Sequence, residues 1–340
     1  MPERKTAAPV ILDVEGLTVE YRTPGETVRA LNGVNFSIRK GQTLGLVGET
    51  GAGKTTTGLS ILQLVPSPPG VLVSGRIVFD GLDLTKLSDK EMQSIRGSRI
   101  SMIFQDPMTS LNPVMSVERQ IAEVISFHEK TDTHAAVEKA RFMLERVGIA
   151  PERGSEFPHQ FSGGMKQRVV IAIALACTPQ LLIADEPTTA LDVTIQAQVL
   201  ELMKDLRARN DTSMLMITHD LGIVADICDA VAVIYGGRVV EYGTLEDIFE
   251  NCRHPYTEGL FNSLPNLKNR SEMLKPIRGD MPDPSRLPKG CVFRPRCDYA
   301  LEICKTEKPG PVYRTEEHFA ACHLYDENTI SERLLLSHGR

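Results

Sequence analysis

A glycine-rich segment near the N-terminus has the residue types that bind phosphate. Residues 48–55 match the pattern G-x-x-x-x-G-K-[ST] at every fixed position, after an expected strand and before an expected helix. Glycines let backbone N–H groups surround the phosphates, Lys54 would reach the β and γ oxygens, and Thr55 would bind Mg²⁺. The predicted contacts are Gly48, Glu49, Thr50, Gly51, Ala52, Gly53, Lys54, Thr55 and Thr56. A glycine turn before an ordinary helix is the less favoured alternative.

Two carboxylates follow an apolar run further along the chain. Residues 181–184 predict a buried strand, and Asp185 and Glu186 come directly after it. Asp185 could hold Mg²⁺ through water, while Glu186 could orient or deprotonate the water that attacks a phosphate. The alternative is that the two carboxylates only cap the end of a strand. The phosphate loop elsewhere in the chain makes this alternative less favoured.

Other polar side chains follow strands or lie near them. His219 and Gln105 each follow an expected apolar strand, and the ends of parallel strands gather at one edge of a sheet. His219 could therefore bond to the γ-phosphate, and Gln105 could contact Mg²⁺ or the attacking water. Tyr21 could stack on adenine. A purely structural histidine, and a helix cap at Asp192, remain the alternatives.

A second segment could also bind an anion. Ser162-Gly163-Gly164 offers a hydroxyl and bare backbone N–H groups at the start of a basic helix. Ser162 lies 108 residues beyond Lys54 (162 − 54 = 108), with an expected helical stretch between them. The two half-sites need not face each other within one molecule. We therefore predict a phosphate site shared between two ATPase subunits.

The bulk composition is that of a folded protein. The chain has 340 residues, of which 41% are hydrophobic and 24% charged, and its formal net charge is −6. This length predicts about two domains, and the negative charge argues against nucleic-acid binding. The longest apolar run, residues 169–177, is much shorter than the ~20 residues that span a bilayer, and the first residues do not resemble a secretory signal. We expect a cytosolic chain whose membrane role depends on partners.

Strand and helix patterns alternate around these motifs. Strands are expected at residues 10–22, 28–39, 43–47, 76–80, 100–104, 180–184 and 213–218, with a hairpin at 230–242. The pattern at about 107–160 predicts a small helical subdomain. The fold class is therefore α/β, with a mostly parallel sheet covered by helices on both faces. Because proline and cysteine become frequent after residue 255, we divide the chain into a nucleotide-binding domain at 1–255 and an extension at 256–340.

Four cysteines are clustered in the proline-rich extension. They are separated by five, six and 17 residues: Cys291, Cys297, Cys304 and Cys322. In a chain expected in the cytosol, clustered thiols indicate a metal before a disulfide. Four thiolates can hold an iron–sulfur cluster or tetrahedral zinc, and an extension without metal is the third alternative. The other three, Cys177, Cys228 and Cys252, are scattered and are expected to pack as small apolar residues.

Taken together, the motifs, which include Leu191-Asp192 after the acidic strand, resemble the ATP-binding cassette (ABC) family, in the order found in that family. The resemblance adds Asp192 to the predicted nucleotide-binding residues. The resemblance implies a P-loop NTPase with a RecA-like parallel-sheet core, an antiparallel β subdomain and an α-helical subdomain. It implies ATP and Mg²⁺ as cofactors and a head-to-tail dimer, in which Ser162 and Gly164 close on the γ-phosphate held by Lys54 of the other subunit. Met165 and Phe161 depart from the glutamine and leucine of many members.

ABC cassettes also occur in ATPases that act on nucleic acid. Chromosome-type members separate the two half-sites by hundreds of heptad-patterned residues, and translation factors carry two cassettes in one chain. This chain has one compact cassette, which resembles the motor subunit of a bacterial or archaeal importer. We therefore expect no nucleic-acid partner.

A closer resemblance is to the oligopeptide, dipeptide and nickel importers. It is carried by residues 105–113, 161–168, 254–257 and 279–284 and by the clustered cysteines, while Val114 and residues 188–192 are more similar to the first of the two ATPase subunits. The resemblance implies a second, different ATPase subunit, two transmembrane permeases and an extracytoplasmic binding protein. It places the chain peripherally at the cytoplasmic face of the membrane. It also favours [4Fe–4S] over zinc, and peptides over nickel or glycosides.

Overall fold

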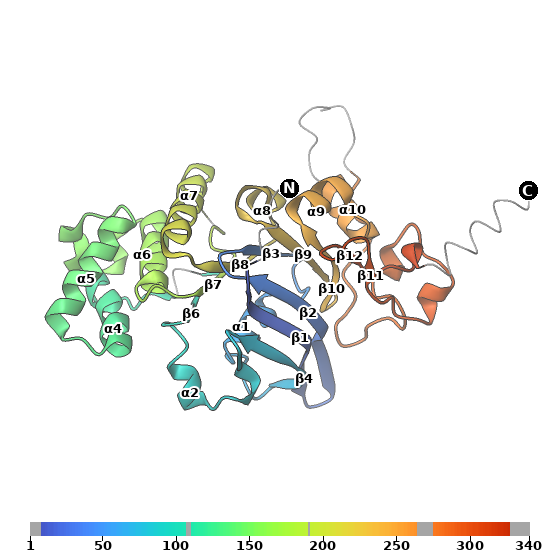
Figure 1. Ribbon diagram of the computed structural model, residues 1–340, viewed down its shortest axis with the longest axis horizontal. Helices are drawn as coiled ribbons and strands as arrows, with labels where there is room; N and C mark the ends of the chain where they lie inside the picture. The colour runs from blue at the N-terminus through green and yellow to red at the C-terminus, as the bar shows by residue number, and fades with distance from the viewer. Residues whose placement is uncertain (1–7, 107–109, 190, 264–274, 327–340) are drawn as a thin grey trace, which may run out of the picture.

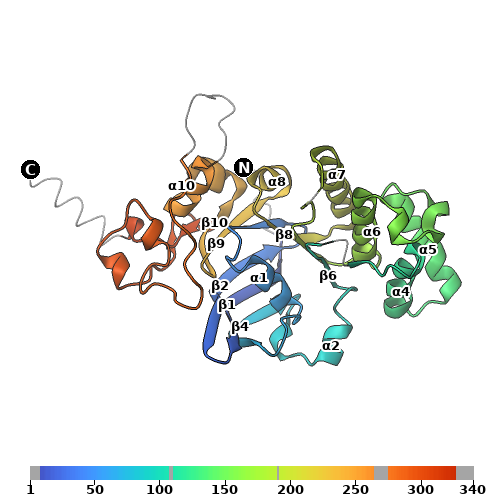
Figure 2. The same ribbon diagram turned by 180° about the vertical axis from the view of Figure 1, so that it is seen from behind.

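A computed structural model describes residues 8–106, 110–189, 191–263 and 275–326. Two sheets share the centre of the molecule, a helical part projects at one end, and the C-terminal extension lies at the other (Figure 1). The view from behind shows α1, Lys54–Ile61, between the two sheets (Figure 2). Among the described residues, helices with the length and apolarity needed to cross a bilayer are absent.

The central sheet has eight strands in the order β11-β12-β10-β9-β3-β8-β7-β6. Strands β6 to β9 and β3 are parallel, and β10 returns antiparallel to β9. Their bounds are β3 Thr43–Val47, β6 Ile100–Ile103, β7 Leu181–Asp185, β8 Ser213–Thr218, β9 Ala230–Tyr235, β10 Arg238–Thr244, β11 Val312–Tyr313 and β12 Phe319–Ala320. The parallel strands are buried at every position, which explains why they appear in the sequence as continuous apolar runs.

The second sheet is antiparallel, with strand order β2-β1-β4-β5. Its strands are β1 Val10–Thr23, β2 Glu26–Arg39, β4 Gly70–Phe79 and β5 Leu82–Asp83. The expected strand at 76–80 begins earlier, at Gly70, because β1 continues to pair with it as far as Tyr21 opposite Gly70. Cross-strand pairing sets the start of this strand. The prolines and glycines before residue 76 favoured a turn there, so the sequence pattern did not predict it.

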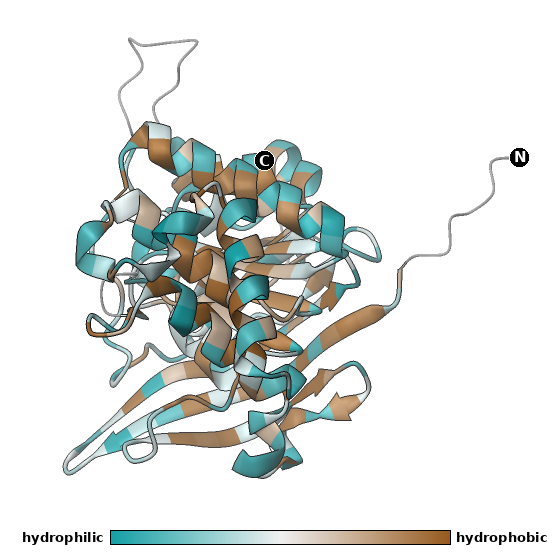
Figure 3. Ribbon diagram, turned by 90° about the vertical axis from the view of Figure 1, so that its left-hand side faces the viewer, coloured by the Kyte–Doolittle hydropathy of each residue, from teal (hydrophilic) through white to brown (hydrophobic). Residues whose placement is uncertain are grey.

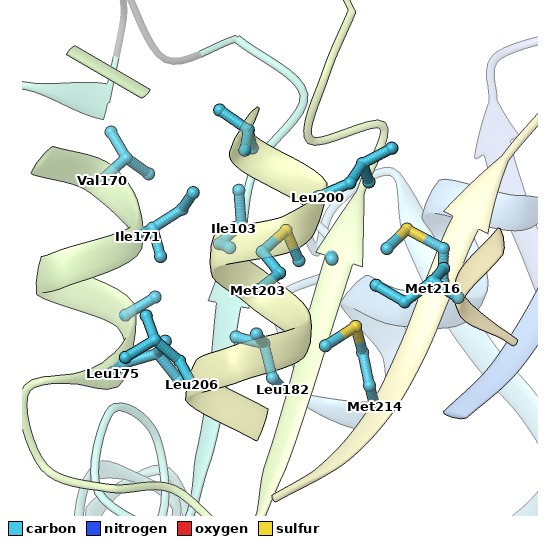
Figure 4. Packing of buried hydrophobic residues seen from close by; sticks show 14 of the residues in the cluster. Ile103, Val170, Ile171, Leu175, Leu182, Leu200, Met203, Leu206, Met214 and Met216 are labelled. Carbon is cyan, nitrogen blue, oxygen red and sulfur yellow. The ribbon is translucent and has the colours of Figure 1, made fainter. Parts of the chain in front are cut away.

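Apolar residues of the central sheet alternate between two cores. Leu182 and Met214 face one core, together with α6, Gly163–Leu175, and α7, Val193–Asn210. Figure 4 shows this packing, in which Met203 and Leu206 of α7 lie in one cluster with labelled residues of α6, β6, β7 and β8. The residues that alternate with these along each strand face the other core, where α1 and the antiparallel sheet cover them. The sheet is therefore covered on both faces, as predicted.

The helical part consists of two helices joined by a short turn. They are α4, Val117–Glu129, and α5, Thr133–Arg146. Asp132 begins α5 by accepting hydrogen bonds from the backbone of His134 and Ala135. Hydrophilic and hydrophobic residues are interspersed along the helices at this end (Figure 3). Residues 107–109, at the predicted start of the subdomain, lie outside the described part of the chain.

The C-terminal extension packs against the rest of the molecule. Helices α8, Leu221–Ile227, and α9, Leu245–Asn251, precede it, and α10, Pro255–Asn262, begins at its boundary. The short helix α2, Asp89–Gln93, lies between β5 and β6. Within the extension, β12 pairs with β10, so that Phe319 lies opposite Tyr242. Two strands of the extension thereby lengthen the central sheet. The division at residue 255 remains a prediction from composition.

Candidate active site

The glycine-rich loop connects β3 to α1, as the sequence predicts. A Cβ atom at Gly48 would lie 2.2 Å from the carbonyl oxygen of Ile234. Gly53 has a φ of +104°, and a Cβ atom there would lie 2.7 Å from the carbonyl oxygen of Ala30. Both positions therefore require glycine, for space and, at Gly53, also for backbone conformation.

Lys54 is buried within this loop. Its Nζ donates hydrogen bonds to the carbonyl oxygens of Gly48, at 2.7 Å, and Glu49, at 3.1 Å. Burial lowers the pKa of Lys54, and the carboxylates of Glu186, Asp185 and Glu49 oppose this change. The ammonium group is thus held within the concavity of the loop, where it can exchange these carbonyl contacts for phosphate oxygens.

Asp185 ends β7 and is almost completely buried. Burial raises the pKa of its carboxyl group, and a hydrogen bond with Thr55 opposes that shift. Its Oδ1 has no hydrogen-bond partner among the described residues. A buried carboxylate oxygen without a partner, next to a threonine hydroxyl, fits the oxygen ligands that Mg²⁺ prefers. The residues present therefore fit a magnesium ion bound with a nucleotide.

Glu186 follows directly and has a left-handed backbone, with a φ of +46°. Its Oε2 accepts hydrogen bonds from Gln105 Nε2 and Thr189 Oγ1, each at 3.0 Å. Its Oε1 lies 2.9 Å from His219 Nδ1. Burial opposes ionisation of Glu186, but the hydrogen bonds from His219 and Thr189 and the charge of Lys54 outweigh it, so that its pKa is lowered. The carboxylate is oriented and ionised at neutral pH.

The structure brings the three predicted catalytic residues, Glu186, His219 and Gln105, into one cluster. Thr189 is a fourth member, which the sequence analysis did not identify. Its position three residues after Glu186, in the turn after β7, could have predicted this contact. In that turn the Thr189 N–H donates to the Glu186 carbonyl oxygen at 3.2 Å. Threonine at this spacing can bond back to an acidic side chain.

These residues open onto a cleft of about 360 Å³. Ten of the predicted residues line it: Tyr21, Thr50, Gly51, Gly53, Lys54, Thr55, Thr56, Gln105, Glu186 and His219. Three further lining residues, Val28, Ala30 and Pro284, were not predicted. Pro284 belongs to the C-terminal extension and comes to the cleft because its carbonyl oxygen accepts a hydrogen bond from the Arg29 backbone.

The Ser-Gly-Gly segment does not line this cleft. Ser162 precedes α6, and its Oγ accepts a hydrogen bond from the Met165 N–H at 3.4 Å. Ser162 and Gly163 are exposed, while a Cβ atom at Gly164 would lie 2.5 Å from Ile195. The start of α6 is therefore open to an external anion, and Gly164 is held against α7.

Asp192 caps α7. Its Oδ1 accepts a hydrogen bond from the Ile195 N–H at 2.9 Å. The helix-cap alternative thus describes its contact within this chain. Its expected role at nucleotide remains a prediction, as do the nucleotide roles of the other site residues.

The four cysteines of the extension are free thiols. Burial raises the pKa of Cys297 to about 11 and that of Cys322 to about 12. Negative charge on Cys291 and Cys304 adds to both shifts, which indicates mutual proximity. In the part of the chain that the structure describes, no group of three or more His, Cys, Asp or Glu residues is arranged to hold a metal ion. A bound cluster is therefore not shown.

Known protein families match both parts of the chain. The family described as ABC transporter matches residues 31–189, and the one described as oligopeptide/dipeptide transporter, C-terminal region, matches residues 240–304. The chain is 54% identical to the oligopeptide transport ATP-binding protein OppD of Bacillus subtilis, over 92% of this chain and 88% of that protein. It is 49% identical to the dipeptide transport ATP-binding protein DppD of the same organism, over 96% and 98%.

Solved structures agree on the fold. The dimeric post-hydrolysis structure of the cassette MJ0796, bound to ADP and Pi, is similar with a TM-score of 0.62 and 26% identity, over 69% of this chain and 98% of that one. CbiO1 from Clostridium perfringens has a TM-score of 0.60 and 28% identity, over 71% and 91%. The predicted α/β cassette fold and the family resemblance are both confirmed. The chain belongs to the ABC transporter family, within its oligopeptide and dipeptide branch, as an ATP-binding and ATP-hydrolysing subunit.

Proposed function

We propose that this chain powers a membrane importer for oligopeptides or dipeptides by hydrolysing ATP at the Lys54–Glu186 cleft. The observation that carries the proposal is the Glu186 carboxylate, which is fixed by Gln105, Thr189 and His219 on the cleft that Lys54 also lines. The relatives supply the substrate class, because their names describe oligopeptide and dipeptide transport.

The residues of the cleft divide the work of phosphoryl transfer. The loop N–H groups and Lys54 hold the β and γ phosphates, and Tyr21 faces the base. Thr55 and Asp185 would hold Mg²⁺, which would supply positive charge against the developing negative charge on the phosphates. Glu186 orients the attacking water and accepts its proton. Gln105 and His219 keep Glu186 in position, and His219, which also lines the cleft, would contact the γ-phosphate.

The ATP site is proposed to be completed by a second subunit. In support, Ser162 and Gly163 are exposed at the start of α6 and lie outside the cleft of their own chain. A helix N-terminus with bare N–H groups attracts phosphate. We propose that the second subunit is a related but distinct ATPase. Two permeases and an extracytoplasmic binding protein would complete an importer, with this chain peripheral at the cytoplasmic face.

The cysteine group is proposed to bind a [4Fe–4S] cluster, with zinc as the second candidate. A cluster is larger than one ion, so the thiolates around it stand farther apart than those around zinc. In support, Cys291, Cys297, Cys304 and Cys322 lie within electrostatic range of one another. Purification without oxygen followed by assay of iron, acid-labile sulfide and zinc tests this. One zinc per chain without sulfide, or no metal, contradicts the cluster.

The transport proposal is tested on the assembled importer. The permeases, the second ATPase and the binding protein are co-purified and reconstituted, and phosphate release is measured with oligopeptide, dipeptide, nickel ion or glycoside present. We expect peptide to stimulate hydrolysis and the other two ligands to leave the rate unchanged. Stimulation by nickel or a glycoside alone would assign the same motor to a different importer. Stimulation by DNA or RNA without the permeases would contradict an importer role.

A further inference from the structure

The C-terminal extension contacts the phosphate loop through a buried arginine. Arg296 Nη1 and Nη2 lie 2.7 and 3.1 Å from the two carboxylate oxygens of Glu49, the second residue of the loop. The Arg296 side chain is 7% exposed and that of Glu49 is 29% exposed. Two parallel hydrogen bonds to one carboxylate fix both its position and its orientation.

Other contacts hold this arginine in place. Its Nε donates to the Arg278 carbonyl oxygen at 2.9 Å. Glu49 is held from a second side, because the Tyr256 hydroxyl oxygen accepts a hydrogen bond from the Glu49 N–H at 2.9 Å. Tyr235 packs against Tyr256 with ring centroids 4.6 Å apart. Glu49 is therefore held at its backbone by Tyr256 of α10 and at its side chain by Arg296, both of which belong to the extension.

Glu49 is close to the groups that hold phosphate. Lys54 Nζ donates to the Glu49 carbonyl oxygen, so the position of residue 49 also sets that of the lysine. The Glu49 carboxylate adds negative charge beside the place where ATP adds more. Arg296 neutralises that carboxylate. Burial disfavours the charged form of Arg296, but the pairing with Glu49 outweighs burial and raises the pKa of Arg296. Without the arginine, a carboxylate whose charge acts on Lys54 would be left unpaired.

We infer that Arg296 is a positioning residue of the nucleotide site, through which the C-terminal extension shapes the phosphate loop and compensates Glu49. This role rests on the proposed nucleotide cleft. Pro284 reaches that cleft from the same extension, which gives the extension a second point of contact with the site.

The test measures binding of a fluorescent ATP analogue with Mg²⁺ to the full chain and four variants. They are Arg296→Met, Glu49→Gln, the double variant, and the matched control Arg294→Met. Arg294 lies in the same short 3₁₀ helix, Arg294–Arg296, and its Nη1 contacts the Lys305 carbonyl oxygen at 3.5 Å. We expect Arg296→Met to raise the Kd about tenfold, because it leaves the partly buried Glu49 carboxylate without its partner. The control should stay within about twofold of wild type, since its contact is a single long hydrogen bond.

The double variant separates compensation of charge from damage to the fold. If Arg296 acts by neutralising Glu49, removing both charges restores most of the affinity, and the double variant resembles Glu49→Gln alone. A Kd for Arg296→Met equal to that of wild type overturns the inference. So does a double variant as weak as Arg296→Met, or a control that is equally weak. Failure of the wild-type chain to bind the analogue would instead contradict the proposed nucleotide cleft.

Discussion

Replacing Glu186 with glutamine removes a charge and preserves the shape of the site. The carboxylate has two donors on Oε2, from Gln105 and Thr189, and His219 Nδ1 on Oε1. A glutamine can direct its carbonyl oxygen to the first two and its NH₂ group to an unprotonated His219 Nδ1. The variant should therefore fold and still bind ATP.

The expected loss is in the chemical step. The amide cannot accept a proton, and it orients water less strongly than a carboxylate. Removing one group that stabilises the transition state costs about 10²- to 10³-fold in kcat, or ~3–4 kcal/mol. Phosphate release by the assembled importer measures kcat, and a filter assay with labelled ATP measures the nucleotide retained. We expect kcat to fall by that factor while ATP remains bound and unhydrolysed.

The matched control is Glu201→Gln, an exposed position on α7 whose nearest cation is Lys204 at 3.8 Å. It should hydrolyse ATP at the wild-type rate, because an exposed ion pair contributes little. Hydrolysis by Glu186→Gln at the wild-type rate would refute the assignment of Glu186 as the base. An equal loss in both variants would show that the assay reports general damage.

Three further predictions follow from the site. His219→Ala removes a hydrogen bond that lowers the pKa of Glu186, so we expect the acid limb of the pH–rate profile to move to higher pH and kcat to fall; an unmoved limb contradicts this. The folded-state pKa of Glu186 lies below the ordinary 4.5, so its ionised carboxylate stabilises the fold above that pH, and this stabilisation is lost as the pH falls. The difference in denaturant midpoint between wild type and Glu186→Gln should therefore shrink on acidification. A difference that stays constant with pH argues against this role. Gly164→Ala places a Cβ 2.5 Å from Ile195 and should cost ~1–3 kcal/mol in urea unfolding, in contrast to Gly163→Ala, whose Cβ meets no atom within 4 Å.

The sequence was sufficient for the parts of the site that depend on local pattern. The loop at 48–55 is set by glycine and lysine spacing, and the apolar runs before Asp185 and His219 are buried strands of a parallel sheet. Because such strands end at one edge, side chains far apart in the chain could be placed together before the structure was known. The cluster of Gln105, Glu186 and His219 confirms that placement.

Contacts made by the irregular extension could not be predicted in this way. Pro284 and Arg296 lie in a segment without periodicity, and their partners, Arg29 and Glu49, are more than 200 residues away in the sequence. No propensity or spacing rule relates such pairs. The pairing of β12 with β10 is similar, since each strand of the β11–β12 ribbon has only two residues. These features follow from tertiary packing alone.

ATP-driven uptake of peptide tests the central proposal most directly. Vesicles that contain the assembled importer are loaded with ATP or ADP, and the entry of a labelled peptide delivered by the binding protein is followed. We predict uptake with ATP and wild-type chain, and background uptake with ADP or with Glu186→Gln. Equal uptake with ATP and ADP, or undiminished uptake by the variant, would contradict the proposal that ATP hydrolysis at this cleft powers the importer.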